Sequence, residues 1–79
     1  MKMIVLKSDR KIFSGDVEFV TLPGKKGFFT LESKHAPLIS VLIKGEIKYR
    51  KKKTEEHESI AIEGGFATVK NDLITVCLD

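Results

Sequence analysis

The chain alternates short apolar runs with glycine, proline and charged residues at close intervals, which is typical of strands and not of helices. In its first third the apolar runs cover residues 3–6, 11–13 and 16–22. Gly15 separates the second run from the third, and Pro23-Gly24 ends the third. Proline lacks the donor that a strand ladder needs, and glycine accepts turn geometry. This part of the chain therefore predicts three short strands.

The remaining residues continue the same pattern. Further strands are expected where apolar residues alternate or run together: 28–32, 38–43, 46–51, 59–62, 66–70 and 73–78. Residues 38–43 also fit a short helix, but their length and β-branched content favour a strand. Turns are expected at Lys44-Gly45, at Gly64-Gly65 as a turn or bulge, and at Asn71-Asp72, whose residue types suit a two-residue hairpin. The pattern predicts an all-β closed antiparallel sandwich or barrel.

Length and composition support one small globular domain over residues 1–79. Hydrophobic residues make up 42% and charged residues 32%, so the chain is not of the disordered class. A single cysteine excludes an internal disulfide. The apolar runs are too short for a signal peptide or a membrane helix. We expect a protein that is soluble, or peripheral to a membrane through a partner.

The charge is mildly basic and partly local. The net charge is +3, with a basic run at Lys48–Lys53 followed by Glu55, Glu56 and Glu58. Opposite charges side by side indicate two arms of one hairpin. One alternative function is a small nucleic-acid-binding barrel that uses this basic arm, with Phe28, Phe29 and Tyr49 as stacking rings.

The residues that commonly carry chemistry form no recognisable constellation. Cys77 lies between apolar neighbours in the last run, where a buried and inert thiol is expected. His35 and His57 have no metal-ligand spacing with each other or with Cys77, and the glycines match no nucleotide-binding fingerprint. We therefore expect no catalytic, cofactor or metal site, and a small enzyme that uses His35 and Cys77 is the weakest alternative.

Phe28-Phe29 is a candidate for partner contact. Neighbouring residues of a strand face opposite ways, so one ring should enter the core and the other should not. An exposed phenylalanine beside a turn is a candidate binding residue.

In their order and spacing, the punctuated stretches resemble the amino-terminal β-sandwich domain of the epsilon subunit of F-type ATP synthases. The resemblance covers nearly the whole chain and is carried by Phe13, Gly15, Val17, Pro23, Gly24, Gly27, Leu31, His35, Ala36, Pro37, Leu38, Gly45, Gly64, Gly65, Phe66, Val76 and Asp79. It implies a flattened antiparallel β-sandwich of about eight to ten short strands. In the family this domain is no enzyme by itself; it belongs to the central stalk, binds the gamma subunit and touches the membrane c-ring.

The resemblance therefore implies a non-catalytic rotor subunit that helps couple rotation to ATP synthesis, on the cytoplasmic face of the bacterial inner membrane. Its implied partners are the gamma subunit and the c-ring, without nucleic acid, membrane insertion or cofactor. The implied contacts with the c-ring are Lys26, Gly27, Phe28, Phe29 and Thr30. The implied contacts with gamma are His35, Ala36, Pro37 and Leu38.

The sequence departs from the family pattern in two places. Where the family often has an acidic residue and a second glycine after the position of Gly27, this chain has Phe28, Phe29 and Thr30. Contact by this loop should be more apolar and more basic than usual. The family usually continues into a carboxy-terminal helical hairpin that can inhibit ATP hydrolysis. The 79 residues contain no such hairpin, so we expect them neither to bind ATP nor to inhibit hydrolysis.

Overall fold

The computed structural model describes residues 1–54 and 56–79, and its regular elements are strands. They are β1 (Lys2–Lys7), β2 (Arg10–Gly24), β3 (Gly27–Glu32), β4 (Leu38–Lys51), β5 (His57–Lys70) and β6 (Leu73–Leu78). In the part of the chain that the structure describes, no helix is long and apolar enough to cross a membrane.

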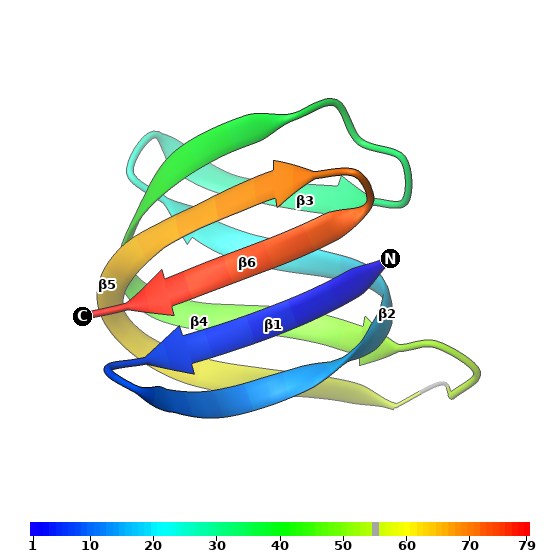
Figure 1. The fold of residues 1–79 in the computed structure, drawn as a ribbon. Coiled ribbons are helices and arrows are strands. Elements are labelled where there is room, and N and C mark those ends of the chain that lie inside the picture. Colours follow the sequence, from blue (N-terminus) through cyan, green and yellow to red (C-terminus); the bar gives the residue numbers. More distant parts are fainter. Residues whose placement is uncertain (55) are drawn as a thin grey trace.

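Five of the strands close into a barrel. The strands are hydrogen-bonded in the order β1-β6-β5-β4-β2-β3, and an additional pairing between β1 and β2 closes the ring (Figure 1). β3 lies outside the ring and pairs with β2 alone among the described strands. The all-β class is confirmed. One detail differs from expectation: β1 and β6 run parallel, whereas the other pairs are antiparallel.

The strand count also differs from the expected eight to ten, because three strands are long and continuous. β2 runs through Gly15, where a strand end was expected. β4 and β5 run through the expected turns at Lys44-Gly45 and Gly64-Gly65, and their ladder stays in register there, with Ile43 opposite Gly64. The glycines permit a bend: φ is +150° at Gly64 and +148° at Gly65, values that other residues rarely adopt. The glycines that suggested turns therefore lie at a bend within the continuous pair of strands β4 and β5.

The bend changes which residues of β4 face the core. Before it Leu42 is buried, and after it Ile47 and Tyr49 are buried, so the inward set moves from even to odd numbers. The ring of Tyr49 packs on Phe13, with centroids 4.7 Å apart. Ile47 and Tyr49 were expected to face inward, and the structure confirms both.

A similar shift occurs in β2, where Val17 and Val20 are both buried although an odd number of steps separates them. The register against β4 changes between Val17 and Phe19, which is the mark of a bulge. The core that results contains the following residues, each 8% exposed or less: Met1, Met3, Val5, Val17, Val20, Leu22, Leu31, Leu42, Ile47, Tyr49, Ile62, Ala67, Val69, Ile74 and Val76.

The tight hairpin between β5 and β6 forms as its residues predict. Asn71 and Asp72 have φ values of 51° and 60°, and Lys70 pairs with Leu73 across the turn. Positive φ at both central residues is the geometry that matches the twist of two antiparallel strands. This turn lies at the same end of the barrel as the amino terminus, since the Lys2 N–H donates to the Asp72 carbonyl at 3.1 Å.

Candidate interaction surfaces

The turn between β2 and β3 carries an exposed aromatic ring. We call residues 25–28 the tip. Phe28 is 74% exposed, whereas the ring of Phe29 packs against the core. The two rings lie on opposite faces of β3 because neighbouring residues of a strand point opposite ways, and Phe29 is on the face of the buried Leu31. The expectation that one ring of the pair would enter the core is confirmed, and Phe29 is that ring.

The structure places the five c-ring candidates on one short segment, but not all on the surface. Lys26, Gly27, Phe28 and Thr30 are exposed, and Phe29 is half-buried. The Thr30 hydroxyl is hydrogen-bonded to the Thr21 hydroxyl at 2.8 Å on the outer face of the hairpin. Phe29 therefore packs the segment against the core, and the other four candidates are exposed to a partner.

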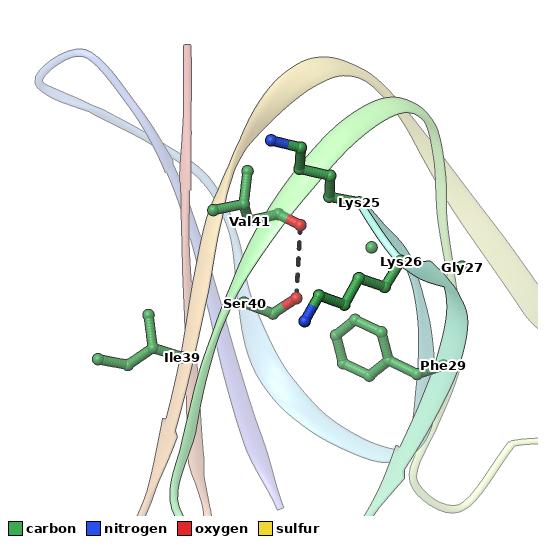
Figure 2. A pocket seen from close by; sticks show the side chains of 8 residues that line it. Lys25, Lys26, Gly27, Phe29, Ile39, Ser40 and Val41 are labelled. Atoms are coloured by element: carbon green, nitrogen blue, oxygen red, sulfur yellow. Dashed lines mark hydrogen bonds between the residues drawn. The ribbon is translucent and has the colours of Figure 1, made fainter.

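A hollow of about 320 Å³ separates the tip from the first half of β4 (Figure 2). Its lining residues come from both segments: Gly24, Lys25, Lys26, Gly27, Phe29, Ile39, Ser40 and Val41. One backbone hydrogen bond joins the two walls, because the Lys25 N–H donates to the Val41 carbonyl at 2.9 Å. The tip is thus attached to β4 at its base.

The connection from β3 to β4 is held by Asp72. Its Oδ1 accepts a hydrogen bond from the Lys34 N–H at 2.8 Å. The Ser33 hydroxyl donates to the same carboxylate and lies 3.1 Å from each of its two oxygens. The amino-terminal ammonium lies 3.6 Å from Oδ2. These contacts lower the pKa of Asp72, and the hydrogen bond from the Lys34 N–H has the largest effect. A side chain distant in sequence therefore fixes the start of the segment that contains His35.

The four candidate gamma contacts follow directly after this anchor. His35, Ala36 and Pro37 are exposed, and Nδ1 of His35 lies 2.7 Å from the Ala36 carbonyl oxygen. Leu38 is half-buried and packs against the core. His35, Ala36 and Pro37 thus form an exposed stretch between the Asp72 contacts on one side and the packed Leu38 on the other.

The most exposed apolar surface lies on the outer side of β4 and β5, next to that segment. Ile39 is 79% exposed, Val41 56%, Ile43 48% and Phe66 47%. Val41 pairs with Phe66 across the two strands. We call these four residues the apolar row. A soluble monomer seldom leaves so many neighbouring apolar side chains in water unless a partner covers them.

The sequence itself contains a signal for the apolar row. Residues 38–43 are apolar except for Ser40, so a strand there must have apolar side chains on both faces. One face of this strand packs into the barrel core. Among the described residues no strand covers its other face, so the apolar side chains there are exposed.

The basic arm does not assemble a stacking platform. Lys51 Nζ lies 2.9 Å from Glu58 Oε2, which agrees with two oppositely charged arms of one hairpin; Glu55 lies outside the described residues. Tyr49 is 4% exposed and serves the core. Phe28 is at the Gly24–Gly27 turn, whereas the basic arm pairs with β2 at residues 17–21. In the described residues the rings of Phe28 and Tyr49 are therefore not placed beside the exposed lysines of the basic arm.

The residues of the enzyme alternative do not meet. Cys77 is near the end of β6, and His35 is close to the 71–72 turn at that strand's start. Cys77 is half-buried, not fully buried as its apolar neighbours suggested, because its side of β6 faces outward beside Phe66. His57 packs near the ring of Phe19, with centroids 5.7 Å apart. Within residues 1–54 and 56–79, no three potential ligands are grouped to hold a metal.

A family model agrees with the fold and the motifs. The beta-sandwich domain of the ATP synthase delta/epsilon chain matches residues 1–79, the entire chain. The chain belongs to that family. The β-sandwich class of the structure agrees with that of the family.

The curated relatives that the chain matches are named ATP synthase epsilon chain. The ATP synthase epsilon chain of Leptospira borgpetersenii is 32% identical over all 79 residues, and that of Dehalococcoides mccartyi strain BAV1 is 37% identical over the same length. The chain spans 61% and 55% of these two relatives.

Solved structures share the fold. A chain in the mitochondrial ATP synthase of Euglena gracilis, solved as an assembly of OSCP, F1 and c-ring, superposes with a TM-score of 0.86 at 18% identity, over 96% of this chain and 48% of that one. A chain from the central stalk and c-ring of the Tetrahymena thermophila enzyme gives 0.81 at 14% identity, over 98% and 61%. At these identities the likeness concerns the fold alone.

Proposed function

We propose that this chain is a non-catalytic central-stalk subunit of a proton-translocating F-type ATP synthase, where it helps couple rotation to ATP synthesis. The observation that carries the proposal is the exposed apolar row on a barrel whose family is that of the epsilon chain. An exposed apolar face of this extent on a small domain marks a binding surface.

The apolar row and the adjoining segment His35–Leu38 form the surface that we assign to the gamma subunit. A standard interface buries about 800 Å² on each partner. The chain exposes 5215 Å², so such an interface needs about a seventh of its surface. Charged groups are depleted at the centre of protein interfaces, and the row itself contains none.

The second contact that we assign is between the tip and the c-ring. Lys26, Gly27, Phe28 and Thr30 supply its exposed side, and Phe29 holds the hairpin to the core. With both contacts made, the domain lies on the cytoplasmic face of the bacterial inner membrane as a peripheral part of the complex.

The test is association with the gamma subunit of the same organism. The wild-type chain should co-purify with gamma and bind it at micromolar concentration or better. Val41→Asp places a charge in the middle of the apolar row, and loss of a central contact of about 2 kcal/mol corresponds to roughly 30-fold weaker binding.

Thr54→Asp is the matched control, because it adds the same charge at an exposed turn outside the row. It should bind gamma as the wild type does. Val41→Thr keeps the shape and the strand preference, so it should fold normally and weaken binding less. The proposal fails if the two folded wild-type proteins do not associate, or if Val41→Asp and Thr54→Asp behave alike.

A further inference from the structure

Asp72 lies on a part of the fold that keeps its carboxylate in one place. It is the second residue of the turn between β5 and β6, across which Lys70 pairs with Leu73. Its carbonyl accepts a hydrogen bond from the Lys2 N–H at 3.1 Å, so the chain at β1 also secures the turn. In Figure 1 this turn and the connection from β3 to β4 lie side by side at one end of the barrel. The carboxylate is therefore a firm point of attachment for that connection.

The connection consists of residues 33–37, between the end of β3 and the start of β4. In residues 1–54 and 56–79, the hydrogen bonds that the structure shows from this connection to another element end on Asp72. They come from the Lys34 N–H and the Ser33 hydroxyl. The bond at His35 stays within the connection, because Nδ1 lies 2.7 Å from the carbonyl oxygen of the next residue. One side chain thus supplies the polar contacts that attach this stretch to the barrel.

The backbone of the connection also needs such an attachment. Lys34 has a φ of 64°, a left-handed conformation that residues other than glycine adopt at a cost. Residues persist in sparsely populated conformations only where their surroundings hold them there. The Lys34 N–H donates to Oδ1 of Asp72 at 2.8 Å, and this bond holds Lys34 at the point where the chain continues into His35. Loss of the carboxylate would therefore release the start of the exposed stretch.

We propose that Asp72 is a positioning residue for the contact with the gamma subunit. It holds residues 33–37 in the conformation that presents His35, Ala36 and Pro37 to that partner. The inference rests on the proposed function, in which these three residues belong to the gamma surface. A segment that is ordered before binding loses less conformational freedom when the partner arrives. When it is not ordered, the apparent affinity falls in proportion to the fraction of molecules that have the binding conformation.

Asp72→Gly removes the carboxylate and keeps the turn. Glycine accepts the φ of 60° at this position, and Asn-Gly is a favoured pair for a two-residue hairpin. The folded variant should bind gamma about tenfold more weakly than the wild type, the loss expected if about one molecule in ten has the binding conformation. Asp72→Asn keeps an oxygen that can accept the Lys34 N–H, so it should restore most of the affinity.

Asn71→Gly is the matched control. It introduces the same residue into the same turn, at a φ of 51°, and leaves the carboxylate of Asp72 in place. It should bind gamma as the wild type does. A general weakening of the β5–β6 turn would instead affect both glycine variants.

Hydrogen exchange of the isolated 79-residue chain tests the attachment without gamma. The Lys34 amide should exchange about tenfold faster in Asp72→Gly than in the wild type, because its acceptor is gone. The amides of β5 and β6 should exchange at wild-type rates, since the hairpin itself is unchanged. Asn71→Gly should leave the Lys34 amide as it is in the wild type.

Three results would overturn the inference and leave the proposed function standing. The first is wild-type affinity for gamma in folded Asp72→Gly. The second is an equal loss of affinity in Asp72→Gly and Asn71→Gly. The third is an unchanged exchange rate at Lys34 in Asp72→Gly, which would mean that the carboxylate does not hold the connection. If the wild-type chain itself does not bind gamma, the proposed function fails and the inference fails with it.

Discussion

The opposite placement of the two neighbouring phenylalanines makes a quantitative prediction about stability. Truncating a fully buried phenylalanine to alanine costs about 3–5 kcal/mol. Phe29 is half-buried against the core, so Phe29→Ala should lower the free energy of unfolding by about 1.5–3 kcal/mol. Phe28 is 74% exposed, and Phe28→Ala should change it by less than about 0.5 kcal/mol.

Urea unfolding of the two variants and the wild type measures these differences directly. In a domain of this size each kcal/mol moves Tm by about 4–8 °C, so Phe29→Ala should melt roughly 6–24 °C lower. The slope of the unfolding free energy against urea should remain unchanged. Equal losses for both variants, or a larger loss for Phe28→Ala, would refute the assignment of Phe29 to the core.

Two further predictions concern backbone and charge. Gly65→Ala would place a Cβ against the Cys77 carbonyl oxygen at a φ of +148°, so it should cost about 2 kcal/mol or more in urea unfolding. Gly27→Ala meets no atom within 4 Å and should cost less. Asp72 has a lowered pKa, caused first by the Lys34 N–H, so its ionised form stabilises the fold above the unfolded-state pKa of about 3.9. This stability is lost as pH falls through the lower, folded-state pKa; Asp72→Asn should flatten that dependence in acid titrations of Tm, and an unchanged slope would contradict it.

The hairpin at residues 71–72 and the facing of several strand residues were predicted correctly because they depend on neighbouring residues alone. Asn71-Asp72 formed the expected hairpin because both residues tolerate positive φ. The alternation of Ile47 and Tyr49, and the opposite faces of Phe28-Phe29, follow from the two-residue period of a strand. These features depend on a few neighbouring residues, and the strand and turn pattern alone indicated an all-β sandwich or barrel, which the family resemblance narrowed to a flattened sandwich.

The features that depend on distant segments were not predictable from such signals. Gly45 suggested a turn, but in the fold it accommodates a close approach, since a Cβ there would lie 3.0 Å from Cβ of Pro23. The hydrogen bond from the Lys34 N–H to the Asp72 carboxylate joins residues 38 positions apart. Residues 38–43 were expected to form a strand, but only the closure of the barrel determines which of the two apolar faces of that strand is covered and which stays exposed.

The parallel pair that closes the barrel also determines how the domain resists a pulling force. β1 and β6 lie side by side from Lys2 opposite Leu73 to Lys7 opposite Leu78, and Figure 1 shows the two chain ends at opposite sides of this pair. A force that separates the ends would slide one strand along the other and load all the hydrogen bonds between them together. An antiparallel pair pulled from adjacent ends would open one bond after another. Resistance to such force depends on the rate of unfolding and not on the equilibrium free energy. Under such a force the six residue pairs of β1 and β6 would therefore bear the load together, in shear.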